Sequence, residues 1–140
     1  MITVSAFKWV PPFARGQVRD LRVRWELEEA GIPYSSRLIG FEDQTSPAYR
    51  AWQPFGQVPA HEEDGLALFE SGAIVLHIGE KSEALLPTDA GGRARATTWL
   101  FCALNTIEVA IQQYGELFFH EKEDWGRNAG RSSNGAYGCG

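Results

Sequence analysis

Two short segments carry residue types that could together hold a small polar ligand. Gly56-Gln57-Val58-Pro59-Ala60 predicts a strand that opens on a proline, and Phe69-Glu70-Ser71-Gly72-Ala73-Ile74 predicts a strand end followed by a helix start. A hydroxyl and unpaired amides at a helix start can bind a carboxylate, and an adjacent acid can pair with an ammonium group. Each residue alone is typical of ordinary structure, as a strand-start proline, a helix cap or a surface acid. Their adjacency favours a binding site.

An arginine-rich stretch is the second feature that could do chemistry. Four arginines lie within ten residues of an otherwise acidic chain, namely Arg15, Arg19, Arg22 and Arg24. This pattern predicts either a solvated helix face or a patch for a small anionic ligand.

Metal and redox chemistry find little support in the spacing of residues. The histidines His61, His77 and His120 show no ligand-like spacing, so no metal site is predicted. Cys102 and Cys139 lie far apart without a CxxC motif, which argues against a disulfide framework and against a thiolate metal site.

Composition narrows the class of protein further. The chain has 140 residues, a net charge of -5 and 44% hydrophobic residues, which is typical of a globular domain and argues against a nucleic-acid binder. Since no apolar run could span a bilayer, no membrane partner is predicted. The first residues show a strand pattern rather than a signal peptide, so we expect a cytoplasmic location.

Hydrophobic periodicity and turn residues predict the elements that position these side chains. We expect strands at 2–8, 34–39, 58–62 and 66–69, and helices at 17–30, 47–52, 71–80 and 92–119. In the first long helix, a broad apolar stripe is expected, made of Val18, Leu21 and Trp25 with Val23, Leu27 and Ala30. The order predicts an α/β protein, a thioredoxin-like βαβαββα domain followed by the first helix of an all-α domain.

The predicted domains follow from the breaks in this pattern. Residues 1–80 form the thioredoxin-like domain, 81–90 a linker and 91–125 a partial helical domain. Residues 126–140 are rich in glycine and poor in apolar side chains, so we expect a disordered tail.

Four sequence blocks, in order, carry a resemblance to a known family. They are Leu27–Tyr34, Pro54–Ala60, Phe69–Ile74 and Leu86–Asp89. Over residues 1 to about 120 the chain resembles the glutathione S-transferase superfamily, in which a thioredoxin-like domain binds glutathione and a helical domain follows.

The resemblance assigns roles to the residues of the two opening segments. It implies that Pro59 follows a cis peptide bond and that Val58 offers its backbone N–H and C=O to the cysteinyl unit of glutathione. Ser71, expected as the helix cap, would bind the γ-glutamyl carboxylate, and Glu70 would pair with the ammonium group. Gln57 resembles a family glutamine that binds near the same end.

The position that activates the thiol departs from the family pattern. The family places Ser, Tyr or Cys just after the first strand, where this chain has Val10, or Gly16 or Gln17 in an alternative alignment. We therefore hypothesise that Arg15 and the amides near Gly16 stabilise the thiolate, the alternative being that Arg15 is a surface loop residue.

The loop before the short second helix departs as well. Relatives often carry basic residues there, which meet the glycyl carboxylate. This chain has Asp43, which would repel that carboxylate, and Gln44, which could donate hydrogen bonds to it.

The sequence thus predicts a glutathione-binding transferase that conjugates the glutathione thiolate to small apolar electrophiles. No cofactor is implied beyond glutathione as co-substrate, and a homodimer is expected where the full helical domain is present. The alternatives are a non-catalytic binding or interaction module and an inactive truncated product. A glutaredoxin-like thiol oxidoreductase would need a cysteine near the end of the first strand, where none is present.

Overall fold

The computed structural model of the chain describes residues 1–120, with side chains described to residue 115. Contacts divide the chain into two units, Met1–Thr98 and Trp99–Gly140. The first unit contains the sheet. The expected tail at 126–140 lies outside the described residues, and the expected domain boundaries stay predictions.

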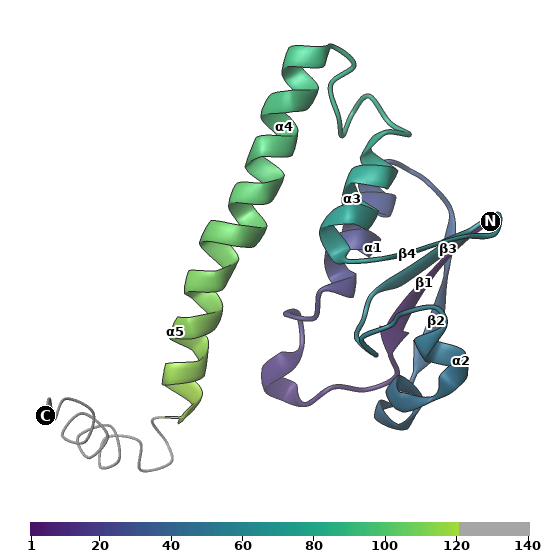
Figure 1. Cartoon of the computed structure of the whole chain (residues 1–140), viewed down its shortest axis with the longest axis vertical. Coiled ribbons are helices and arrows are strands. Elements are labelled where there is room, and N and C mark those ends of the chain that lie inside the picture. Colours follow the sequence, from purple (N-terminus) through teal and green to yellow (C-terminus); the bar gives the residue numbers. More distant parts are fainter. Residues whose placement is uncertain (121–140) are drawn as a thin grey trace, which may run out of the picture. The chain divides into compact units, whose positions relative to one another are not determined.

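A four-stranded mixed sheet forms the centre of the first unit (Figure 1). Its strands are β1 (Ile2–Phe7), β2 (Tyr34–Ile39), β3 (Ala60–Glu63) and β4 (Leu66–Phe69), in the order β2-β1-β3-β4. β1 and β2 are parallel, while β1–β3 and β3–β4 are antiparallel. The helices α1 (Asp20–Glu29), α2 (Pro47–Arg50) and α3 (Ser71–Gly79) complete the predicted βαβαββα order, and the α/β fold class is confirmed.

Two apolar clusters hold the helices to this sheet. The larger cluster joins β1, α1 and α3 through Ile2, Val4, Val23, Leu27, Ile74 and Ile78. The smaller cluster joins the end of β2, α2 and the start of β3 through Ile39, Tyr49, Trp52, Val58 and Ala60. Val58 and Ala60 belong to the smaller cluster, and Leu68 packs against the larger one. The segment that carries the predicted binding residues is therefore anchored to the core.

The predicted apolar stripe on the first long helix is partly wrong. α1 begins at Asp20 rather than at residue 17, and it packs through Val23 and Leu27. Leu21 and Trp25, in contrast, are 37% and 69% exposed. The helix ends at Glu29, and Gly31 follows its cap as predicted, with a φ of +64° that suits a glycine after a helix terminus.

Helices continue beyond the sheet in two segments. α4 (Ala90–Cys102) begins beside Asp89, whose carboxylate accepts a hydrogen bond from the Gly92 amide at 2.7 Å. A π-helical turn, η3 (Ala103–Ile107), separates α4 from α5 (Glu108–His120). Among the helices at residues 1–120, none has the length and apolar character that a membrane span requires.

Candidate functional site

Strand register brings the two predicted binding segments to one edge of the sheet. Ala60 pairs with Phe69 at the end of the β3–β4 hairpin. The residues just before Ala60 and just after Phe69 therefore lie at the same edge. The peptide bond between Val58 and Pro59 is cis, as the family resemblance implied.

A buried hydroxyl relay holds the backbone around Pro59. The Ala60 amide donates to Ser5 Oγ at 2.7 Å, Ser5 Oγ lies 2.8 Å from the Tyr49 hydroxyl, and that hydroxyl donates to the Gln57 carbonyl at 2.6 Å. A carbonyl can only accept, so the one Tyr49 proton goes to Gln57 and the Ser5 hydroxyl donates to Tyr49. Sequence reasoning missed both hydroxyls. The available signal was a serine between the apolar residues Val4 and Ala6 of β1.

The relay leaves the backbone of Val58 available for a ligand. Neither its amide nor its carbonyl has a hydrogen-bond partner among residues 1–120. Its side chain is buried in the smaller apolar cluster, while the Gln57 side chain is exposed. The segment can therefore present polar backbone groups on a fixed base.

The start of α3 differs from the prediction by one residue. Ser71 is the first helical residue rather than the cap, and the cap position belongs to Glu70, at φ +68° and ψ 114°. The Glu70 side chain makes no capping hydrogen bond and the residue is exposed, so its carboxylate can meet a cationic group. Ser71 is buried, and its hydroxyl lies 3.4 Å from Nη1 of Arg22.

The arginine-rich stretch separates into different environments. Arg22 reaches the start of α3, whereas Arg24 pairs with Asp20 at 3.3 Å. Burial raises the pKa of Asp20, and the bond from Arg24 opposes that rise. Arg15 is exposed in the loop before α1. Arg22 is thus tied by a contact to Ser71, a predicted binding residue. Its proximity to Ser71 was not deducible from spacing.

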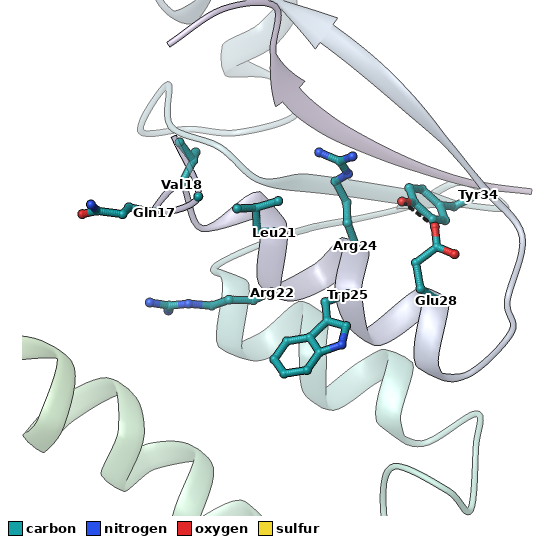
Figure 2. Close-up of a pocket in the computed structure, with 9 residues that line it drawn as sticks. Gln17, Val18, Leu21, Arg22, Arg24, Trp25, Glu28 and Tyr34 are labelled. Atoms are coloured by element: carbon teal, nitrogen blue, oxygen red, sulfur yellow. Dashed lines mark hydrogen bonds between the residues drawn. The ribbon is translucent and has the colours of Figure 1, made fainter. Parts of the chain in front are cut away.

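A surface cavity of about 650 Å³ runs along α1 (Figure 2). Its lining residues are Gly16, Gln17, Val18, Leu21, Arg22, Arg24, Trp25, Glu28 and Tyr34. Figure 2 shows Gln17 and Arg22 extending toward the same side, with Glu28 and Tyr34 at the other end of the helix. Gln17 is also tied to its own loop, since its amide donates to the Phe13 carbonyl at 3.1 Å.

The loop expected to meet the glycyl carboxylate is held by its own hydrogen bonds. Gln44 donates to the Gly56 carbonyl at 2.5 Å, so part of its donor capacity is used. Asp43 accepts from the Gly40 amide at 2.7 Å and lies 3.7 Å from Nζ of Lys8. Lys8, which sequence reasoning did not select, offsets the negative charge of Asp43 in this loop.

Comparison with known proteins agrees with this geometry. A family model described as the N-terminal domain of glutathione S-transferase matches residues 13–80. The chain belongs to the glutathione S-transferase superfamily. It is similar to glutathione S-transferase 4 of Zea mays, with 37% identity over 99 residues, which cover 67% of this chain and 40% of the relative. A disulfide-bond oxidoreductase of Escherichia coli shares 35% identity over 98 residues, covering 62% of this chain and 45% of the relative.

Solved structures of glutathione transferases have the same fold. One from Burkholderia graminis, with two glutathione molecules bound per subunit, is similar at a TM-score of 0.68 and 32% identity. The match covers 85% of this chain and 49% of that chain. The chain thus spans about half the length of that solved protein, and 40% and 45% of the lengths of the two curated relatives.

Proposed function

We propose that this chain binds glutathione and transfers its thiolate to small apolar electrophiles. The observation that carries the proposal is the open backbone of Val58 at the same sheet edge as Glu70 and Ser71. An extended peptide could pair with Val58 by strand addition while its charged end lies at the start of α3.

The chemistry of glutathione fits the two ends of this edge. Its γ-glutamyl end carries a carboxylate and an ammonium group, for which the Ser71 hydroxyl and the Glu70 carboxylate are suitable partners. Arg22 adds a positive charge beside Ser71, and the exposed Gln57 can bind the same end. Gln44 would bind the glycyl carboxylate with its remaining donor capacity.

The thiol would lie near the loop that precedes α1. We assign its activation to Arg15 and the amides near Gly16, because a positive charge or a donor close to sulfur lowers its pKa. Gly16 lines the cavity along α1, where an apolar electrophile could approach beside Leu21 and Trp25.

The binding half of the proposal is tested with glutathione and a shortened ligand. Calorimetry would compare glutathione with cysteinylglycine, which lacks the γ-glutamyl group, for the wild-type protein and for Ser71→Ala. We expect Ser71→Ala to weaken glutathione about tenfold, the effect of one lost charge-assisted hydrogen bond, and to leave the dipeptide unchanged.

Ser36→Ala, at an exposed position of β2, is the matched control and should bind both ligands as the wild type does. Equal affinity for the two ligands in every variant would show that the start of α3 does not recognise glutathione.

The catalytic half is tested by conjugation to an aromatic halide. The assigned role would be supported if Arg15→Ala lowers the conjugation activity and raises the thiol pKa of bound glutathione. Equal thiol pKa values in the two proteins would remove Arg15 from the mechanism. Binding without conjugation would instead support a non-catalytic binding module, and a chain that binds no glutathione would contradict both functions.

Reduction of disulfides by glutathione is a second candidate function. It is favoured by the similarity to the Escherichia coli disulfide-bond oxidoreductase and to the structure with two bound glutathione molecules. Two glutathione thiols would reduce one disulfide to two thiols and form one oxidised glutathione. An assay with hydroxyethyl disulfide, coupled to glutathione reductase, separates this activity from conjugation.

The assembly and the location belong to the same proposal. We propose a cytoplasmic homodimer, on the analogy of transferases of this family. Sedimentation of the purified chain and of a version that includes any further helical residues would measure the assembly state.

A further inference from the structure

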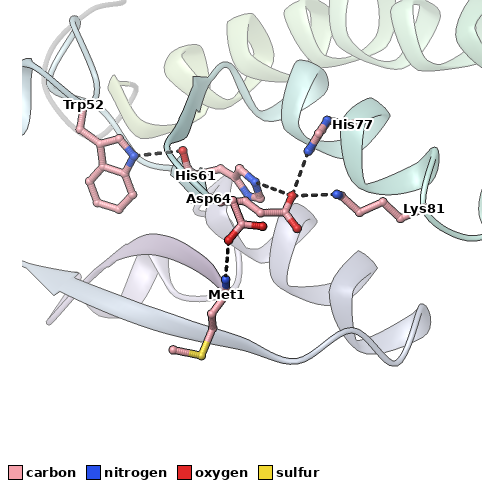
Figure 3. Close-up of polar contacts among 7 residues, drawn as sticks. Met1, Trp52, His61, Asp64, His77 and Lys81 are labelled. Atoms are coloured by element: carbon pink, nitrogen blue, oxygen red, sulfur yellow. Dashed lines mark hydrogen bonds and ion pairs between the residues drawn. The ribbon is translucent and has the colours of Figure 1, made fainter.

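Two histidines and a glutamate that are distant in sequence meet between β3 and α3. His61 and Glu63 lie on β3, and His77 lies on α3. Nε2 of His77 is 3.2 Å, and Nε2 of His61 is 3.9 Å, from the same oxygen of Glu63. Candidate ligand atoms of the three residues all lie within 4.8 Å of one another. Figure 3 shows His61, His77 and Lys81 joined by dashed lines to one carboxylate oxygen.

His61 is the least satisfied polar group in this cluster. Its side chain is 0% exposed, and neither ring nitrogen has a hydrogen-bond partner among the described residues. Its carbonyl accepts from Nε1 of Trp52 at 3.0 Å, so its backbone is fixed while its ring lacks a partner. Buried polar side chains normally have partners, and an unpaired one destabilises the fold unless a ligand fills the position.

We propose that His61, Glu63 and His77 form a binding site for Zn²⁺. Two imidazoles and one carboxylate are a common zinc ligand set, with a fourth position left for water. In tetrahedral coordination with bonds of about 2.0–2.1 Å, neighbouring ligand atoms stand about 3.3 Å apart. The observed separations from the Glu63 oxygen bracket that value, so small side-chain movements would complete the site.

Solvent reaches the cluster through its two less buried members. The side chains of Glu63 and His77 are 19% and 26% exposed, which gives an ion a path from solvent.

Lys81 supplies a cation to the same carboxylate. Its Nζ lies 2.8 Å from the same Glu63 oxygen, and its side chain is 33% exposed. A divalent ion would displace this ammonium group into solvent. Lys81 therefore competes with the metal, and removal of its charge should favour binding of the metal.

The zinc site is independent of the proposed glutathione chemistry. It would join the last turn of α3 to β3. The sequence suggested no metal site because the histidines are sixteen positions apart, and only the packing of α3 on β3 brings them together.

The test uses the full chain, freed of metal by a chelator and titrated with Zn²⁺ and separately with Co²⁺. We expect one ion per wild-type chain, a higher thermal unfolding temperature with Zn²⁺, and the intense visible absorption of tetrahedral Co²⁺. Glu63→Gln and His77→Gln should each weaken binding at least tenfold. Lys81→Met should bind about tenfold more tightly, which corresponds to ~1.4 kcal/mol of repulsion removed.

Glu62→Gln is the matched control, because it removes the same charge from an exposed neighbouring position of β3. It should bind Zn²⁺ as the wild type does, and circular dichroism would verify that each variant is folded. Absence of stoichiometric binding in the wild type, or equal affinity in Glu62→Gln, Glu63→Gln and His77→Gln, would overturn the site. Unchanged or weaker binding in Lys81→Met would overturn the displacement of the lysine.

Discussion

The hydroxyl relay from Ala60 through Ser5 and Tyr49 to Gln57 makes a quantitative prediction about stability. Ser5→Ala removes two of its three hydrogen bonds and leaves the fully buried Ala60 amide without a partner. With about 1 kcal/mol for each bond and about 1 kcal/mol more for the orphaned amide, we expect a loss of about 3 kcal/mol.

Tyr49→Phe removes a different pair of bonds. The Ser5 hydroxyl loses its acceptor, while the Gln57 carbonyl belongs to an exposed residue and can bond to water. We expect a loss of about 2 kcal/mol. Because the Ser5–Tyr49 bond is counted in both variants, the double variant should lose about 1 kcal/mol less than the sum of the two.

Urea unfolding followed by tryptophan fluorescence gives the unfolding free energy of the wild type, the two single variants and the double variant. Ser36→Ala is the control, and its unfolding free energy should change by no more than about 0.5 kcal/mol. If the loss in the double variant equals the sum of the two single losses, within the ~0.3–0.5 kcal/mol expected of independent sites, the relay is not continuous. Both relay variants should also weaken glutathione binding, since the Val58 backbone would lose its support. If a relay variant is destabilised but binds glutathione as the wild type does, the relay does not support the proposed site.

Three further perturbations follow from individual contacts. Arg22→Met should weaken glutathione binding about tenfold, as measured by calorimetry, because it removes the charge beside the proposed carboxylate site; an unchanged affinity would place Arg22 outside that site. Burial raises the pKa of Glu26 from 4.5 to about 7, so ionisation lowers stability progressively as the pH rises from about 4.5 to about 7. Glu26→Gln should therefore match the wild type near pH 4.5 and exceed its unfolding free energy by roughly 3 kcal/mol above pH 7, and parallel pH curves in urea unfolding would contradict this. Gly56→Ala should lose about 2–3 kcal/mol, because φ is +66° and its Cβ would meet the Gln44 carbonyl, whereas Gly16→Ala, at φ +78° in open space, should lose about 1 kcal/mol. Similar losses in both glycine variants, compared by thermal unfolding, would argue against the steric contribution.

Local sequence signals predicted most of the elements because each signal acts over a few residues. The strand at Tyr34–Ile39 has its predicted bounds, and Gly31 ends the helix before it. The start of α3 was placed one residue off. The reason is that Glu70 adopts a left-handed φ, which a capping pattern does not anticipate for this residue type.

Burial of individual helix faces was harder to predict. Val23 and Trp25 both fit an apolar stripe with helical spacing, yet Val23 is fully buried and Trp25 is exposed. Periodicity identifies candidate faces, but the rotation of the helix on the sheet selects one of them.

The sequence by itself determined the order of elements, the family and the residues expected to bind glutathione, because turn residues, periodicity and motif order are local properties. The tertiary structure alone decided which distant side chains meet. Ser5 joins Tyr49, Arg22 reaches Ser71, and His61 faces His77. Such contacts depend on strand register and on helix packing, and spacing along the chain does not encode them. For that reason the proposed glutathione site was foreseeable in outline, while the hydroxyl relay beside it and the cluster of His61, Glu63 and His77 were not.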